Sequence, residues 1–458
     1  MSFDPGLRHL REAVVTMVAV LATVGTVLLV DPQPSFAVLG VVLVLGLSRS
    51  GLADSRRGFV EGLVILPAVG LATLGAGLLL HALPIVGAIV FTGGMFLSIW
   101  LRRFGTLAAR IGSLIALPLM TLLVVPPAGG GRFGGLGFLV PIAVSLVALG
   151  WVALLRWGGR RAGLIVAKAR VERAASASGL RPVASTRMAI QMAIALVASF
   201  AAGYLLFPER WAWIVLTAFI VCSGNRGRVD VAWKSILRVV GAAAGTVVAI
   251  VASAGIGGHD GWTVALILVA VFLGIWLRPV NYAFWALLVT IALALLQGFT
   301  GGVAHVEFLP RLEEIVVGAI LALLATWFVL PVRSTNVARK RLSDALGALQ
   351  LVIAGDAADA EPTTDDERLA AFARASAALR EVRTPFAAWR LVRRTGHSPA
   401  DWSDLLDEVA PLAIAYRDRG RADSTVLRAL GAARRSVREP PAISPALTAL
   451  RDALVAAS

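Results

Sequence analysis

The sequence predicts an all-α polytopic membrane protein with duplicated six-helix membrane units, about twelve spans in all, followed by a C-terminal cytoplasmic helical domain. The 458 residues are 58% hydrophobic and only 16% charged, whereas a soluble protein of this length carries about 25% charged residues. Long apolar runs alternate with short basic loops, as in helical membrane proteins. One seven-residue stretch occurs twice, which indicates that the membrane unit is duplicated.

The repeated stretch reads FLSIWLR at residues 96–102 and FLGIWLR at residues 272–278, an offset of 176 residues. In both copies an apolar run ends in Trp, Leu and Arg. A membrane helix ends in this way when its indole lies at the headgroups and its guanidinium in cytoplasmic water. Gly70 and Gly245 lie near the same offset. We interpret these matches as a duplicated unit, an organisation that many transporters share.

Twelve apolar runs, six in each half, are candidates to cross a bilayer, which takes about 20 residues. They cover residues 11–30, 35–47, 59–80, 85–101, 107–126, 134–155, 188–207, 211–222, 236–254, 262–277, 282–298 and 311–330. The second and eighth runs have only about 12 residues and occupy equivalent places in the two halves. Short segments at corresponding places point to a transport site. Alternatively, neighbouring residues extend each run into an ordinary tilted span.

The distribution of Lys and Arg orients the spans. With the N-terminus inside, the inner loops hold 21 cations and the outer loops hold three, namely Arg132, Arg210 and Arg311. This bias supports an even number of spans in the cell (inner) membrane, with both termini in the cytoplasm. The first run follows two arginines as a signal peptide would, but it ends without a small-residue cleavage pattern. We therefore expect an uncleaved first span.

The spans and charges divide the chain into four regions. They are a first six-span unit at 1–155, a basic cytoplasmic linker at 156–187, a second six-span unit at 188–332 and a cytoplasmic helical domain at 333–458. The last region holds 19 Lys/Arg and 16 Asp/Glu, and its apolar residues recur at helical spacing. Beyond a first helix through Leu342 and Leu349, we expect helices at 367–394, 401–419, 422–437 and 444–456. The near-balanced charge favours ordinary solvated faces, although a basic helix could touch anionic lipid.

Several function classes are excluded because their motifs are missing. The sequence has no G-x-S-x-G, no H-E-x-x-H and no Walker lysine, so we expect neither an enzyme nor an ATP-driven pump. Cys222 is the only cysteine and the five histidines are scattered, so we expect no cofactor and no metal. The net charge of +15 follows from topology rather than from nucleic-acid binding, because the membrane-unit cations lie mostly in short loops.

Polar groups in or beside the spans are the functional candidates, because they are costly in a bilayer. The second half carries them in five groups: Arg187 with Gln191, Glu209 to Trp213 with Thr217, Arg238 with Gly241 and Gly245, Tyr282 with Thr290, and Arg311 with Glu314 and Gly318. Their order resembles the fusaric acid resistance protein-like family, also called aromatic acid exporters. The resemblance covers about residues 185–332 and reaches the first half only through the repeat. Glu314 stands where an Asp is usual in the family. The two membrane units are also nearly adjacent here, whereas many members place a large soluble domain between them.

The same residues have structural interpretations. Gly241 and Gly245 form a small-x-x-x-small face that lets helices approach closely. Arg238 is either a topology anchor at the start of the ninth span or a cation that faces a cavity and attracts an organic anion. Arg311 and Glu314 lie about one turn apart, so they either pair with each other or leave Glu314 able to titrate and carry a proton.

Two further groups remain. Trp211 and Trp213 are expected in the interfacial belt. Gln191, Tyr282 and Thr290 either hydrogen-bond substrate or join neighbouring helices. We expect substrate binding by Arg238, Gln191, Tyr282, Thr290 and Arg311, and proton coupling by Glu314.

The resemblance, the duplication and the missing ATP motif together imply a secondary transporter that exports aromatic or other weak organic acids, driven by the proton gradient. Export suits a weak acid, because its neutral form leaks into the cell, ionises in the cytoplasm and is trapped there. The alternatives are a passive organic-anion channel and a non-transporting membrane scaffold. The expected partners are a small organic anion and the lipid bilayer, without nucleic acid. The oligomeric state stays open, with a homo-oligomer as one option.

Overall fold

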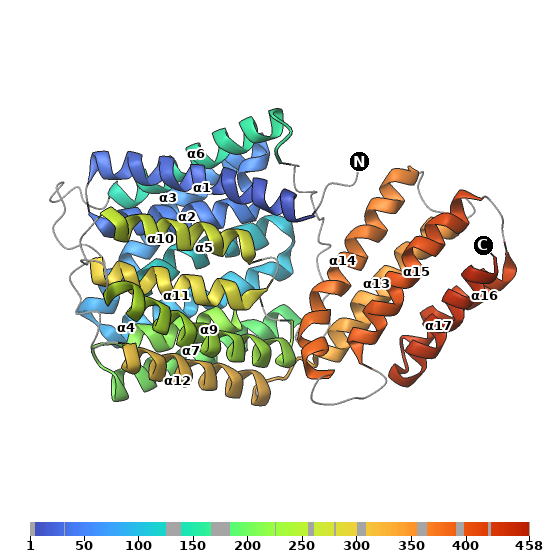
Figure 1. Cartoon of the computed structure of the whole chain (residues 1–458). Coiled ribbons are helices and arrows are strands. Elements are labelled where there is room, and N and C mark those ends of the chain that lie inside the picture. The colour runs from blue at the N-terminus through green and yellow to red at the C-terminus, as the bar shows by residue number, and fades with distance from the viewer. Residues whose placement is uncertain are drawn as a thin grey trace. The chain divides into compact units, whose positions relative to one another are not determined.

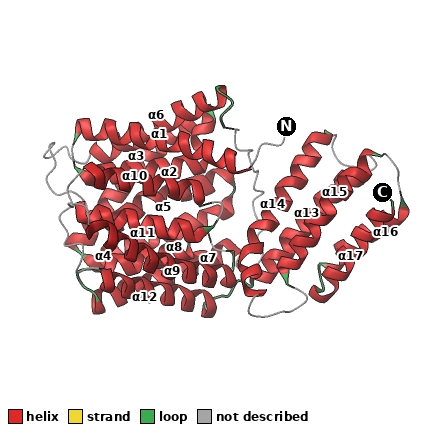
Figure 2. Ribbon diagram, in the orientation of Figure 1, coloured by secondary structure: helices red, strands yellow, loops and turns green. Residues whose placement is uncertain are grey.

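The computed structural model of the chain describes residues 5–31, 33–124, 139–165, 184–224, 226–254, 261–278, 281–299, 308–354, 364–390, 398–419 and 423–457. These residues form seventeen α-helices and two short 3-10 segments, and they contain no strand (Figure 2). The all-helical class is therefore confirmed. The first twelve helices are α1 Pro5–Val30, α2 Pro34–Ser50, α3 Arg56–Ala82, α4 Pro84–Trp100, α5 Thr106–Val124, α6 Leu139–Arg161, α7 Ala184–Leu206, α8 Trp211–Cys222, α9 Arg228–Ala254, α10 Gly261–Leu277, α11 Tyr282–Phe299 and α12 Phe308–Phe328.

Six stretches of the described residues are long and apolar enough to cross a membrane. They are His9–Val30, Arg56–Ala82, Pro84–Phe104, Leu139–Arg161, Ala184–Leu206 and Arg228–Val248. Shorter apolar helices include Ser35–Ser50, Trp211–Cys222, Gly261–Leu277 and Tyr282–Leu296. The chain is thus a multi-pass membrane protein by length and hydropathy. The number of about twelve spans and the orientation stay predictions.

The two segments predicted to be short differ in length. Helix α8 has 12 residues, or about 18 Å, so the eighth segment is shorter than a bilayer span. Helix α2 has 17 residues, because Pro34 begins it in the first turn and Gly51 ends it with a φ of +66°. Neighbouring residues therefore lengthen the second segment toward a full span.

Helices of the two halves pack in matching pairs. In the first half α1 packs on α2 and α6, α2 on α6, and α4 on α5; in the second half α7 packs on α8 and α12, α8 on α12, and α10 on α11. Between the halves, α4 packs on α7 and α1 on α10. For these pairs, adding six to each helix number converts one set into the other, and Figure 1 shows α1 beside α6 and α7 beside α12. A duplicated unit would produce this arrangement of neighbours.

Contacts divide the chain into two units, one of residues 1–224 with 234–331 and one of residues 225–233 with 332–458. The helices of the second unit are α13 Ser334–Ala354, α14 Asp365–Arg390, α15 Pro399–Asp418, α16 Ser424–Ser436 and α17 Pro440–Ala456. They lie within a few residues of the helices predicted from spacing, which are confirmed. Their core includes Leu342, Leu349 and Trp402. At the surface, a hydrogen bond to Asp401 raises the pKa of Arg390.

The second unit also contains a segment from the middle of the chain, residues 225–233. The Val229 N–H donates to Ser334 Oγ at 3.0 Å, and Arg226 Nη2 lies 3.0 Å from Glu381 Oε2. Gly227 has a φ of +113°, and a Cβ there would lie 2.5 Å from Ser334 Oγ. Glycine is therefore the residue that this approach requires.

The linker predicted at 156–187 is described only at its ends. Helix α6 continues to Arg161 and α7 begins at Ala184. Residues 166–183 lie outside the described residues.

Candidate functional site

Helices α9 and α11 approach each other closely at two glycines. A Cβ at Gly241 would lie 2.9 Å from the Ala286 Cβ and 3.0 Å from the Leu287 nitrogen. A Cβ at Gly245 would lie 2.9 Å from the Leu287 carbonyl oxygen. At each glycine one of these distances is 2.9 Å, which is too short for a Cβ unless the neighbouring helix shifts. The predicted close-packing role of the two glycines is therefore confirmed.

Arg238 lies beside this contact and is only 1% exposed. Its Nη1 donates to Thr290 Oγ1 at 3.3 Å, and the Thr290 hydroxyl donates in turn to the Ala286 carbonyl at 2.8 Å. The hydroxyl oxygen is thereby turned toward the guanidinium. Arg238 Nε and Nη2 are buried and have no hydrogen-bond acceptor among the described residues. Two N–H groups of a buried guanidinium are thus left for another acceptor.

The Arg238 side chain reaches a residue of α11 that lies further along α9 than Arg238 itself. A Cβ at Gly245 would lie 3.1 Å from the Thr290 Cβ, so these two residues are level. Gly245 comes seven residues after Arg238, which is about 10.5 Å along the helix, yet the guanidinium reaches Thr290. Gly241, Ala242 and Gly245 follow Arg238 on the same helical face. Their small size leaves room for the long side chain.

Tyr282 begins α11, two turns before Thr290. It lies near enough to Arg238 and Arg278 to interact electrostatically with both. Arg238, Tyr282 and Thr290 therefore gather at one interface, between α9 and the first half of α11.

The motif of Arg311, Glu314 and Gly318 lies along α12 where this helix packs on α8. The guanidinium carbon of Arg311 is 3.9 Å from the centroid of the Trp213 ring. Glu314 Oε1 is 3.1 Å from Arg210 Nε, and a Cβ at Gly318 would lie 2.5 Å from the Ile214 carbonyl oxygen. The motif thus sets the register between α12 and the start of α8.

Two of these contacts change the sequence interpretation. Trp213 is only 8% exposed, so the expectation that it belongs to an interfacial belt was wrong; it packs inside the bundle beneath Arg311. Glu314 is 0% exposed and its side chain meets Arg210, whose side chain is 38% exposed. A buried carboxylate is thereby linked to the surface by one guanidinium.

Gln191 lies on α7 at the C-terminal end of α12. Its Nε2 donates to the carbonyl oxygens of Val329 at 2.9 Å and Leu330 at 3.2 Å. The last carbonyls of a helix have no partner within the helix, so Gln191 satisfies groups at the end of α12. From the sequence, Gln191 either hydrogen-bonds substrate or joins neighbouring helices. The structure shows the contact between helices.

The six predicted site residues fall into three places. Arg238, Tyr282 and Thr290 lie together, Arg311 and Glu314 lie at the start of α12, and Gln191 lies at its far end. Thr326, a third acceptor of Gln191, comes twelve residues after Glu314, or about 18 Å along α12. Sequence reasoning missed Arg210 and Trp213 as contacts of the motif. The position of both residues, at the start of the short eighth segment, was the sequence signal that could have identified them.

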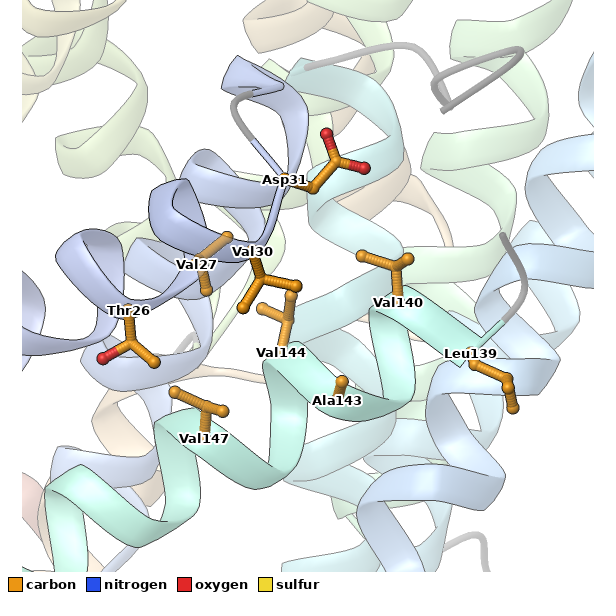
Figure 3. Close-up of a pocket in the computed structure, with 9 residues that line it drawn as sticks. All are labelled: Thr26, Val27, Val30, Asp31, Leu139, Val140, Ala143, Val144 and Val147. Carbon is orange, nitrogen blue, oxygen red and sulfur yellow. The ribbon is translucent and has the colours of Figure 1, made fainter. Parts of the chain in front are cut away.

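A cavity of about 310 Å³ between α1 and α6 is less suited to an anion (Figure 3). Its walls are mostly valine side chains, and its one charged lining residue among those described is the carboxylate Asp31. The described residues also contain no group of three or more His, Cys, Asp or Glu side chains that could hold a metal.

Comparison with known proteins bears on the second half of the membrane unit. No curated protein and no solved structure matched the chain. A family model matches residues 192–325, a segment that begins one residue after Gln191. This segment includes Arg238, Tyr282, Thr290, Arg311 and Glu314. The resemblance seen in the motifs is confirmed for this segment: residues 192–325 match the model of the fusaric acid resistance protein-like family.

Proposed function

We propose that this protein is a secondary transporter that exports aromatic or other weak organic acids and is driven by the proton gradient. The family match over residues 192–325 supports membrane transport in general. The matching helix pairs of the two halves support a duplicated unit, an organisation that many transporters share.

The buried guanidinium of Arg238 is the observation that carries the proposal. An uncompensated charge away from water is costly, and Arg238 has one neutral hydrogen-bond partner and two buried nitrogen atoms without acceptors among the described residues. A carboxylate would compensate the charge and accept from both nitrogen atoms in the two-pronged geometry that guanidinium favours. An organic anion therefore fits this place better than a neutral or cationic substrate does.

The predicted orientation places Arg238 toward the cytoplasm and Glu314 toward the outside. An anion from the cytoplasm then meets Arg238 first. Glu314 and Arg210 lie at the opposite end, where protons arrive during proton-driven export.

Protonation of Glu314 is the proposed coupling step. The neutral carboxylic acid no longer attracts the Arg210 guanidinium, so the ion pair that links α12 to the start of α8 is weakened. Because Gly318 packs on the Ile214 carbonyl one turn further along, a change at Glu314 is transmitted directly to the contact between α12 and α8. Proton uptake outside thereby favours a rearrangement of the second half.

The test uses purified protein in liposomes loaded with radiolabelled benzoate. Efflux that accelerates when the proton gradient is imposed supports the proposal. Efflux that follows the benzoate gradient alone indicates a channel, and efflux equal to that of protein-free liposomes indicates a scaffold.

Variants of Arg238 connect the flux to the site. Arg238→Lys keeps the charge but loses the planar fork, and Arg238→Gln loses both, so we expect weak transport from the first and almost none from the second. Wild-type efflux from a normally inserted Arg238→Gln protein would remove Arg238 from the site and leave Arg311 as the next cation to test.

A further inference from the structure

Two other arginine side chains meet where the halves of the membrane unit join. The guanidinium carbon of Arg49, at the end of α2, lies 5.2 Å from the centroid of the Trp285 ring. The guanidinium carbon of Arg278, just past the end of α10, lies 5.2 Å from the same centroid. Helix α2 belongs to the first half and α10 and α11 to the second. One indole therefore contacts cations from both halves.

Gly274 explains how Trp285 reaches this position. A Cβ at Gly274 would lie 3.3 Å from the Trp285 ring, so the missing side chain lets the indole pack against α10. Arg278 follows Gly274 by four residues, so it lies on the same face of α10, one residue past the end of this helix. Attraction between a guanidinium and an indole face then holds each arginine at the ring.

Arg49 and Arg278 also line a cavity of about 330 Å³, together with residues of α1 and α6. Arg156 lines it too, but Arg156 Nε lies 2.6 Å from Asp54 Oδ1, so its charge is compensated. Glu12 is the carboxylate of the lining. Neither Arg49 nor Arg278 forms an ion pair with a carboxylate in the described part of the chain. Apart from Arg156, the lining thus carries two guanidinium groups and one carboxylate, so the net charge of the cavity lining is positive.

We propose that Arg49, Trp285 and Arg278 form a second binding site, which takes a small organic carboxylate at the end of the bundle where α2 and α10 end. This inference rests on the proposed function and deepens it by naming the place where the anion is first bound. A planar guanidinium matches a carboxylate, and the cavity has the volume of a small-molecule site. Arg49 and Arg278 are exposed, so an anion can reach them from water.

The second site leads toward Arg238. Thr290, which holds Arg238, comes five residues after Trp285 on α11, or about 7.5 Å deeper along the helix. An anion that leaves water needs a fixed positive partner at each stage, and sites that bind in series let it enter and leave. The anion passes from the two exposed arginines to the buried one.

The site depends on the arrangement of the two halves. Arg49 belongs to the first half and Arg278 to the second, so a movement of one half against the other would separate them. The anion is bound at this site only while Arg49 stays beside the Trp285 ring.

The test measures benzoate transport from the Arg49 side in liposomes of phosphatidylcholine. Arg49→Gln and Arg278→Gln are expected to raise the half-saturating benzoate concentration at least about tenfold with the maximal rate unchanged, whereas Arg238→Gln lowers the maximal rate. Trp285→Leu should also raise the half-saturating concentration, because it removes the ring that positions both arginines. Arg103→Gln is the matched control: Arg103 lies 5.8 Å from the Trp100 ring centroid and is not among the residues that line the cavity.

Unchanged half-saturating concentrations in Arg49→Gln and Arg278→Gln, alongside an active wild type, would overturn the second site and leave the proposed function standing. If the wild type shows no flux, the proposed function fails and equilibrium dialysis of radiolabelled benzoate against the purified protein decides the site. Weaker binding by Arg278→Gln than by Arg103→Gln then supports it, and equal binding overturns it. Displacement of bound benzoate when phosphatidylglycerol replaces a part of the phosphatidylcholine would assign the cluster to lipid headgroups and also overturn it.

Discussion

Arg210 and Glu314 form an ion pair, with 3.1 Å between Nε and Oε1, that joins the turn before α8 to the first turns of α12. Glu314 is fully buried, whereas Arg210 is partly exposed. Protonation of the carboxylate would therefore disturb this pair, and the coupling prediction is built on that relationship.

Replacing Glu314 by Gln should uncouple transport from protons. The substitution keeps the shape and the hydrogen-bonding capacity of the side chain but removes the charge that titrates. Efflux driven by a proton gradient against a benzoate gradient should be lost, while benzoate exchange without a proton gradient should continue. Glu313→Gln serves as control, because Glu313 is the exposed neighbour. Equal effects of the two substitutions would contradict the role given to Glu314.

Thr290 should matter to transport through its hydroxyl group. Thr290→Val keeps the shape but removes the acceptor for Arg238, and a hydrogen bond to a charged group contributes about 1.5–3 kcal/mol. We expect a loss of roughly tenfold or more in transport rate from Thr290→Val. Thr290→Ser retains the hydroxyl and should transport nearly as the wild type does. Loss in Thr290→Ser but not in Thr290→Val would indicate that the methyl group, rather than the hydroxyl, is required.

Gly245→Ala should destabilise the membrane unit. The new Cβ would lie 2.9 Å from the Leu287 carbonyl oxygen, so α9 and α11 must move apart, and overpacking of this kind costs about 1–3 kcal/mol. Thermal unfolding in detergent measures the change. Gly93→Ala is the control, since its Cβ would have no neighbour within 4 Å. A melting temperature of Gly245→Ala at or above that of Gly93→Ala would show that the two helices tolerate separation.

The predicted orientation is tested by reporter fusions. A reporter fused after Ser458 should lie in the cytoplasm, and one inserted at Gly130, which is outside the described residues, should lie on the other side of the membrane. The physical reason is that Lys and Arg are concentrated in the loops predicted to be cytoplasmic and are rare in the loops predicted to be outside. Both reporters on one side would refute the topology.

The helices of the C-terminal unit could be predicted from sequence because their apolar residues repeat at helical spacing over long stretches. The contact of Gly241 and Gly245 was also predictable, since two glycines four residues apart in an apolar helix have few other uses. Both features depend on residues that are close in the sequence.

The contacts of Gln191, Trp213 and Arg210 could not be predicted in the same way. Gln191 meets the end of α12 only because α7 and α12 pack side by side, which no local pattern encodes. Trp213 is buried, with Arg311 over its ring, whereas its position at the start of an apolar run is equally typical of a belt residue. Arg210 is predicted to be an outer-loop cation, and the sequence carries no sign that Glu314 lies beside it.

The segment that precedes and begins α9 has a consequence for how the chain is made. Val229 bonds to Ser334, 105 positions later in the sequence, so the residues that fix the first turn of α9 are synthesised only after the remaining membrane helices. A chain interrupted after Pro331 would insert α9 without those residues. The contact at the first turn of the helix that carries Arg238 therefore forms only in a product that extends through Ser334.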